Sequence, residues 1–524
     1  MISSRANHRC LTVFLVLTCV GCASVPRPQL RETGGWNQYS SAHFELQTDL
    51  GPSDVRRAMQ YLEQARTALL ATAWPGIQFP EATKIQVTVL SDGLEFERLF
   101  TRHVAGFFTT RNFATRLVMY GDPDHWERHV TGNAELGDSV LKHELVHRLA
   151  SYLYLRQPRW FTEGLARFLE TVRVSPDGRT ATLGIVNLAA LRSFSAQRTI
   201  SVADALAWGG PRDRNPSPER TYVLYSVSWA LVHWLYNQHP SQFATFQQEL
   251  ARGADPTAAW THMFPRSTLE EIDREVYAYT RHGEFQKFTY PLTPQAVEVT
   301  SRPLSAVEVH VLRSQLALEA VFLSSERTRE HVLEAKAEAA AALSTDPTDA
   351  RALMADDTHR TPGTQLEAAS RSVHAHPADP IAWFLYGRAL QMTDRGGAKA
   401  QAAYHKAVIV DPGFSEAFNA LAWIHLMNRR PQDALPFAQR AVRLAPWSAA
   451  NVDTLAGALS GVGRCGDALQ VQNHAIDLLN ERLSAQDRKP YLDHLETVKT
   501  RCHPVETPVT TEASRNTVTQ LLII

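Results

Sequence analysis

The hydrophobic pattern near the start of the chain changes period several times. Apolar and polar residues alternate over 43–50 and 84–90, which predicts two strands, and short apolar runs at 107–110 and 116–120 predict two more. Between the first two strands, 52–71 has the apolar spacing of an amphipathic helix. The sequence therefore predicts a small sheet in this part of the chain.

Mainly helical patterns follow that sheet. A hairpin is predicted over 171–184, because Pro176-Asp177-Gly178 is a strong turn signal. The apolar, aromatic-rich stretch 222–236 predicts a largely buried helix. Further helices are predicted at 240–253, 256–264 and 267–281. A sheet followed by helices is typical of an α+β fold.

The second half of the chain contains an internal repeat. Pro377, Pro412 and Pro446 are 35 and 34 residues apart, and alanines recur in register with them. This spacing is typical of tetratricopeptide repeats, in which each unit is a pair of antiparallel helices and successive units stack. The sequence therefore predicts an all-α solenoid of three such units after the α+β domain.

These patterns divide the chain into consecutive regions. The predicted regions are a signal peptide (1–22), a tether (23–36), the α+β domain (37–285), a Pro-rich linker (286–305), a helical region with a degenerate repeat (306–379), three repeat units (380–480), a capping helix (481–502) and a disordered tail (503–524). The composition fits this division, because 44% hydrophobic residues is ordinary for soluble globular domains.

The overall charge argues against one class of partner. The 524 residues include 53 basic and 54 acidic side chains, which give a formal net charge of −1 at pH 7. Proteins that bind nucleic acid usually show a basic surplus. We therefore do not expect a nucleic-acid partner.

The N-terminus has the pattern of an export signal. An apolar run over 11–20 follows a basic start and ends at Cys22, and it is too short to span a membrane. Small residues leading to a cysteine resemble a bacterial lipoprotein signal, which implies lipidation of Cys22 and attachment to a membrane through acyl chains only. Cys19 stands where such signals usually have Leu, so cleavage after Ala23 is the alternative. We expect an exported protein, either an outer-membrane lipoprotein facing the periplasm or a periplasmic or secreted one.

Candidate chemistry is concentrated in the sequence HELVH. His143 and His147 are four residues apart, so in a helix their imidazoles lie on one face and can reach one ion, with Glu144 beside them. This is the HExxH arrangement of zinc hydrolases. A chance match is the alternative, because the chain has 21 histidines. A separate apolar stripe on the same helix, Leu141, Leu145 and Leu149, favours the metal site.

A third ligand is expected on the following helix. Zinc in a catalytic site keeps three protein ligands and one open position. Glu163 begins the next helical pattern after a turn, and Gly164 beside it leaves room for two helices to approach closely. Glu170 lies seven residues further on the same face, where it can accept a hydrogen bond from a ligand histidine. A solvated carboxylate at the helix end is the equal alternative for Glu170.

HELVH followed by WFTEGLARFLE resembles the glutamate-zincins, a clan of metallopeptidases, and in particular the compact peptidase-MA-like proteins of bacterial envelopes. The resemblance covers 36–285 and implies a zincin-like fold with one Zn²⁺ per chain. It implies His143, His147 and Glu163 as ligands and Glu144 as general base. It also implies that the strand before the helix lies at the edge of the cleft, where a substrate can pair with it. That strand comprises Arg116, Leu117, Val118, Met119 and Tyr120, and the alternative is that it is simply buried.

Hydrolysis of a peptide bond also requires a group that stabilises the oxyanion. Members of this clan often use a downstream Tyr or His, and Tyr225 is the candidate in this sequence. The alternative is a core tyrosine whose hydroxyl is hydrogen-bonded within the fold.

Two cysteines remain outside the export signal. Cys465 lies at the turn between the two helices of the third repeat, and a returning capping helix would bring Cys502 back beside it. Disulfides persist in exported proteins, so we predict this pair. Two unpaired thiols are the alternative.

Together these features predict a zinc-dependent endopeptidase of the bacterial envelope, with a protein or peptide substrate. The concave face of the repeat array would recruit that substrate or an envelope protein. The competing hypothesis is a catalytically silent scaffold in which the repeats carry the function. A zinc aminopeptidase is a third hypothesis, but it would need a site for the substrate amine that the sequence does not indicate.

Overall fold

The structure of the protein is a computed structural model. It describes most of the chain, and the predicted signal peptide with Cys22 and the predicted tail lie outside the described residues. No described helix is long and apolar enough to cross a membrane. The described residues are 34–77, 84–100, 106–109, 116–121, 126, 140–197, 199–209, 217–323, 327–356, 361–393, 397–479 and 485–502.

The main sheet of the described residues has the strand order β4-β5-β3-β2-β1-β9. Strands β2, β3 and β5 are parallel to one another, whereas β4 is antiparallel to β5, and β1 is antiparallel to both β2 and β9. The strands are β1 (Asn37–Ser40), β2 (Phe44–Thr48), β3 (Ile85–Leu90), β4 (Gly106–Thr109), β5 (Arg116–Tyr120) and β9 (Thr300–Pro303).

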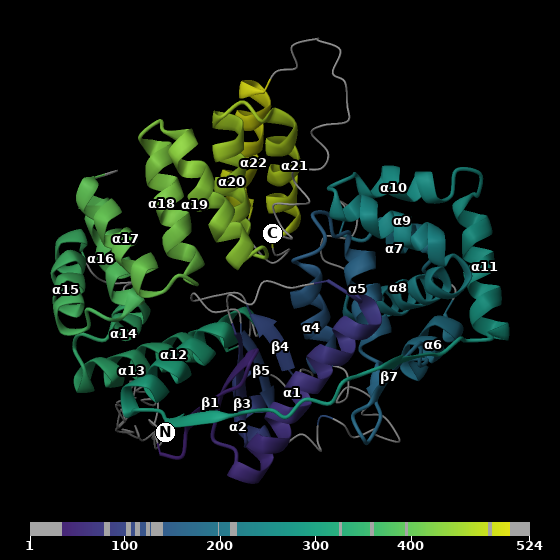
Figure 1. Cartoon of the computed structure of the whole chain (residues 1–524), viewed down its shortest axis with the longest axis horizontal. Coiled ribbons are helices and arrows are strands. Elements are labelled where there is room, and N and C mark those ends of the chain that lie inside the picture. The colour runs from purple at the N-terminus through teal and green to yellow at the C-terminus, as the bar shows by residue number, and fades with distance from the viewer. Residues whose placement is uncertain are drawn as a thin grey trace, which may run out of the picture.

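Helices cover both faces of this sheet (Figure 1). Successive side chains of a strand point to opposite faces. Leu117 and Met119 accordingly join the core formed with α1 (Pro52–Ala73) and α4 (Val140–Ala150). Val118 joins a second core on the other face, with α2 (Gly93–Leu99) and α12 (Ala306–Leu323).

The region predicted as a linker, 286–305, contains two strands, so this prediction is wrong. β8 (Phe288–Pro291) pairs with β7 (Thr180–Leu183), and β9 pairs with β1 at the edge of the main sheet. Proline lacks an N–H donor but is tolerated at strand ends and edges. Pro291 and Pro303 occupy such positions, which explains why a Pro-rich stretch still extends two sheets.

A helical layer completes the N-terminal domain. The predicted hairpin is present, with β6 (Arg173–Val174) paired to β7. At the centre of the helical layer, α5 (Arg159–Leu169) packs on the long buried helix α8 (Pro218–Gln238). The other helices are α6 (Leu188–Ala196), α7 (Val202–Leu206), α9 (Pro240–Ala251), α10 (Pro256–Met263) and α11 (Leu269–His282).

The C-terminal region is an array of antiparallel helix pairs of the tetratricopeptide kind. Consecutive helices pack as hairpins, and each hairpin packs on the next. The pairs are α12 with α13 (Thr328–Thr345), α14 (Ala350–Ala355) with α15 (Pro362–Ala375), α16 (Pro380–Thr393) with α17 (Ala398–Val410), α18 (Ser415–Met427) with α19 (Pro431–Leu444), and α20 (Ala449–Gly461) with α21 (Cys465–Asp477), followed by α22 (Ala485–Arg501).

The array forms an arc that starts against the sheet and returns to the N-terminal domain near α4 (Figure 1). At the returning end, the guanidinium carbon of Arg148 lies 3.0 Å from the ring centroid of Trp447, and Arg156 Nε lies 2.5 Å from Asp477 Oδ2. Leu155 is part of the core of the last repeat. Both ends of the array are therefore packed on the N-terminal domain.

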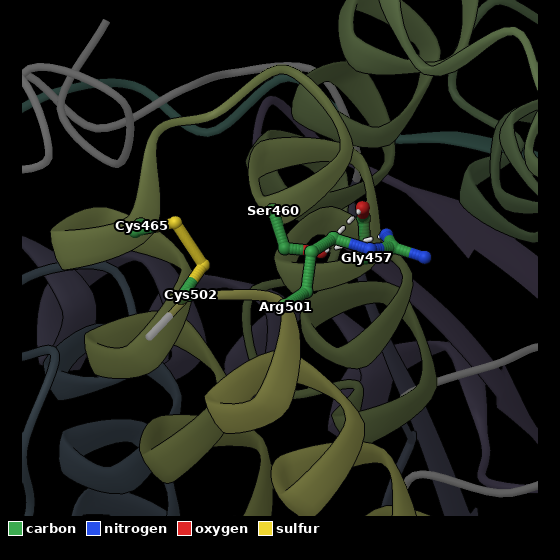
Figure 2. Close-up of a disulfide and its surroundings, with 5 residues drawn as sticks. All are labelled: Gly457, Ser460, Cys465, Arg501 and Cys502. Carbon is green, nitrogen blue, oxygen red and sulfur yellow. Dashed lines mark hydrogen bonds between the residues drawn. A yellow bond between two sulfur atoms is a disulfide. The ribbon is translucent and has the colours of Figure 1, made fainter. Parts of the chain in front are cut away.

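A disulfide joins Cys465 to Cys502, as the repeat alignment predicts. Their Cα atoms are 5.3 Å apart, within the range that a disulfide spans. Figure 2 shows that the bond connects the start of α21 to the end of α22. In the same view Arg501 Nη1 donates to Ser460 Oγ over 3.2 Å, which adds a contact between α22 and α20.

Candidate metal centre

Two antiparallel helices bring the predicted ligands together. α4 buries Leu141, Leu145 and Leu149 and directs His143 and His147 toward α5. The turn between the helices returns the chain, so that Glu163 in the second turn of α5 faces both histidines. One ligand atom from each of these three residues lies within 4.8 Å of the others, and this is the only such cluster of potential metal ligands among the described residues.

The spacing of the three ligand atoms fits a cation. Glu163 Oε2 lies 3.3 Å from Nε2 of His143 and 3.3 Å from Nε2 of His147, and the two Nε2 atoms are 3.1 Å apart. Three acceptor atoms this close repel one another unless a proton or a cation lies among them. Glu163 Oε2 is also buried without a hydrogen-bond geometry to any donor. This arrangement suits a metal ion with two nitrogen ligands and one oxygen ligand.

Glu170 orients one of the histidines. Its side chain is buried at 3% exposure, which excludes the solvated alternative. Its Oε2 accepts from His143 Nδ1 over 2.8 Å, so Nε2 of a neutral His143 presents its lone pair to the centre. Asn187 Nδ2 donates to Glu170 Oε1 over 2.7 Å, and Arg167 Nη1 lies 3.4 Å from the same oxygen.

No sequence pattern identifies Asn187 or Arg167 as part of this network. Asn187 precedes α6 and caps it by accepting from the Ala190 amide, which is the only sequence signal that it carries. Arg167 lies one turn after Glu163 on α5. Their role in holding Glu170 depends on contacts between elements that are distant in sequence.

The electrostatics of the centre follow from burial and from the facing carboxylates. Burial alone would lower the pKa of His143, but the close carboxylates of Glu163 and Glu170 raise it to about 10. Burial also raises the pKa of Glu163, yet the charges of the two facing histidines, His147 first, lower it well below its usual value. A metal ion would take the place of the protons held between these groups.

The half-buried Glu144 has a perturbed pKa. Desolvation raises its pKa above the usual carboxyl value, and the charges of His143 and His147 only partly oppose that effect. The direction of this shift is the one that a carboxylate general base requires.

Tyr225 on α8 lines the same region. Its ring centroid is 6.4 Å from that of His143, and it contacts Trp208 edge-on at 5.2 Å. The guanidinium of Arg167 lies 5.3 Å from the tyrosine ring. The charge of Glu163, together with burial, raises the pKa of Tyr225, so its hydroxyl remains a proton donor. The structure thus places Tyr225 beside the centre.

The structure corrects the prediction for the substrate strand. β5 pairs with β3 on one side and with β4 on the other, so it is not an edge strand. Leu117, Val118 and Met119 are buried, and Arg116 hydrogen-bonds to Gln315 of α12 on the far side of the sheet from α4. The edge beside α4 is β4, because a Cβ atom added at Gly106 would lie 2.9 Å from Val140 Cγ1.

Comparison with known proteins adds one family match. A family described as "Protein of unknown function (DUF1570)" matches residues 139–256, which include α4, α5 and α8. No curated protein matches this chain. Solved structures with similarity include MamA, at 15% identity and a TM-score of 0.24 over 37% of this chain and 98% of that one. Yeast Tom70 is similar at 12% identity and a TM-score of 0.27 over 55% of this chain and 62% of that one.

Proposed function

We propose that this protein is a zinc-dependent endopeptidase. The observation that carries the proposal is the convergence of His143, His147 and Glu163, with Glu144 on the same helix as the histidines. Two imidazoles and one carboxylate, with a further carboxylate as base, are the set that a catalytic zinc site requires.

The residues of the chain would act as follows. His143, His147 and Glu163 would hold a zinc ion, which supplies a Lewis acid and lowers the pKa of a bound water. Glu144 takes the proton of the attacking water and passes it to the leaving amine. Glu170 keeps His143 in the tautomer that binds metal. Tyr225 donates a hydrogen bond to the oxyanion that forms at the scissile carbonyl.

The proposed substrate is an extended peptide segment. β4 is the edge strand beside α4, and edge strands present unpaired backbone groups to which a peptide can add. The helical array would bring a protein substrate or an envelope partner to this domain. We further propose export with lipidation at Cys22, which would place the enzyme at the envelope surface.

Metal analysis and a substrate survey test the proposal. Wild-type protein should hold one zinc per chain, and Glu144→Gln should hold the same amount because Glu144 is not a ligand. Comparing new N-termini in envelope proteins from cells with either form should show cleavages that only the wild type makes. Glu367→Gln, on the exposed face of α15, is the matched control and should cleave as wild type does. Equal cleavage by Glu144→Gln would refute the mechanism.

A silent scaffold is the second candidate function. The observation in its favour is that both ends of the array pack on the N-terminal domain, which makes the two regions one platform. It predicts a folded protein that binds partners and lacks zinc, or that holds zinc without any cleavage dependent on Glu144. The same two measurements therefore separate the two functions.

A further inference from the structure

A cavity of about 450 Å³ lies between the main sheet and the helical array. Strands of the sheet form its floor, and the starts of α16 and α18 with the turn before α20 form its roof. Helices α12 and α14 also line it. Its volume is within the range of small-ligand sites. It is distinct from the metal centre, because none of His143, His147 and Glu163 lines it.

Arg148 is the most unusual residue of this wall. It follows His147 on α4, and its side chain is 5% exposed. Nη1 has no hydrogen-bond acceptor, although the guanidinium stacks on Trp447. Its guanidinium carbon also lies 5.4 Å from the ring centroid of Tyr152, and no carboxylate among the described residues acts on its charge. A buried cation without a carboxylate partner is costly, so it is rarely kept without a ligand or a function.

Arg116 provides a second cation with an unused donor, although the carboxylates of Glu319 and Glu45 act on its charge. Its Nη1 donates to Gln315 Oε1 over 3.0 Å, whereas its buried Nε has no acceptor. Arg116 contacts Gln315 of α12, whereas Arg148 stacks on Trp447 just before α20. The two arginines therefore belong to different parts of the wall. The two unpaired donors therefore favour a ligand that extends along the cavity.

The acidic residues of the wall already accept hydrogen bonds within the protein. Glu45 accepts from Gln38 and Gln86 on the neighbouring strands. Asp411 accepts from the Gly413 amide over 2.8 Å, and Glu416 accepts from Ser415 Oγ over 2.8 Å. Glu308 and Asp349 accept from the backbone amides of Ser305 and Ala352. The unused hydrogen-bonding capacity among the described residues of the wall therefore includes the donors of Arg148 and Arg116, which suit a carboxylate.

One acceptor in the wall is also unpaired, which narrows the class of ligand. Gln47 Oε1 is buried without a hydrogen-bond donor. A phosphate ion offers mainly acceptors, so it matches the unpaired Gln47 oxygen less well than an N–H donor does. A peptide offers both a carboxylate for the arginines and N–H groups for Gln47. We propose that this cavity binds an acidic peptide whose carboxylate pairs with Arg148, with Arg116 as a second donor.

Titration calorimetry on the full-length protein, freed of metal by a chelator, tests this site without any contribution from the metal centre. The probes are acetyl-Ala-Ala-Ala with a free C-terminal carboxylate, acetyl-Ala-Glu-Ala amide with a side-chain carboxylate, the neutral acetyl-Ala-Ala-Ala amide, and inorganic phosphate. At least one carboxylate probe should bind saturably, and about tenfold or more tightly than the neutral amide. The carboxylate probe that binds more tightly shows whether the cavity prefers a C-terminal or a side-chain carboxylate.

Variants then assign the binding to the two arginines. Arg148→Met keeps the aliphatic stem over Trp447 and removes the donors, so it should weaken the carboxylate probe about tenfold or more. Arg116→Met should also lower the affinity for the carboxylate probe. Arg371→Met is the matched control and should leave the affinity unchanged, because this exposed arginine pairs with Glu367 over 3.3 Å and does not line the cavity.

Three results would overturn the proposal. They are no saturable binding of either carboxylate probe, binding of phosphate more tightly than both, and unchanged affinity in the two arginine variants. If Arg148→Met fails to fold, Arg116→Met and the comparison of carboxylate with amide decide the question. Because the protein is free of metal in these titrations, their outcome is independent of whether the proposed peptidase activity exists.

Discussion

Gly164 is the position at which a single methyl group should disturb the metal centre. It lies next to Glu163 on the face of α5 that packs against α8. A Cβ atom at this position would lie 2.5 Å from the backbone oxygen of Ser228 and 2.8 Å from Val232 Cγ2. The first of these neighbours is helix backbone, which cannot rotate away as a side chain can. Gly164→Ala must therefore push the two helices apart.

The structure gives the size of this effect. Ordinary contact begins at about 3.4 Å, so the Ser228 oxygen and the new methyl must separate by 0.9 Å. Overpacking of this kind costs about 1–3 kcal/mol, and replacing glycine by alanine within a helix returns about 0.5–1 kcal/mol. We expect a net loss of about 1–2 kcal/mol of unfolding free energy. Zinc affinity should fall by about tenfold or more, because Glu163 moves with the helix.

Urea unfolding of the metal-free protein and chelator competition for zinc measure the two effects separately. Gly466→Ala is the matched control, because nothing lies within 4 Å of the added Cβ there and the residue is also helical. It should leave zinc affinity unchanged and stability equal or slightly higher. If Gly164→Ala matched the wild type in both measurements, close packing of α5 on α8 would not be what positions Glu163.

Other predictions address the third ligand, the disulfide and an ion pair. Glu163→Ala should lose zinc in the same chelator competition. If this variant bound zinc as tightly as the wild type, the third ligand would have to be another residue. Cys465→Ser should lower the unfolding free energy of the array by about 3–4 kcal/mol, because it releases a long loop; an unchanged urea midpoint would contradict this. Burial alone would raise the pKa of Glu334, but its interactions with His331 and Arg98 lower it to about 2. The stabilisation of the fold by these interactions is therefore complete above the unfolded pKa of Glu334, near 4.5, and is lost as the pH falls toward 2. Arg98→Met should reduce that loss in acid unfolding, and an unchanged acid transition would refute this role.

Local spacing in the sequence was sufficient to predict the residues of the candidate centre. His143 and His147 share a helix face because they are four residues apart, and Glu163 follows after one turn between antiparallel helices. The same reasoning applied to the repeats, where a regular period of helix pairs placed Cys465 and Cys502 side by side. Each of these two groups of residues lies on neighbouring helices joined by a short turn. The period of the helices alone therefore predicts which residues meet.

Only the tertiary structure decided which segments meet across longer distances. Strand order made β4 the edge in place of β5, and it recruited β9 from a stretch that sequence patterns assigned to a linker. The hydrogen bond from Asn187 to Glu170 joins two elements of the N-terminal domain that are distant in sequence. The cavity between the sheet and the array arises from the return of the array to α4. Strand pairing and the packing of one domain on another join residues with no fixed spacing, and the physical cause is the burial of whole surfaces. The sequence determined the helices and the candidate ligands that they carry, whereas the fold determined what surrounds them.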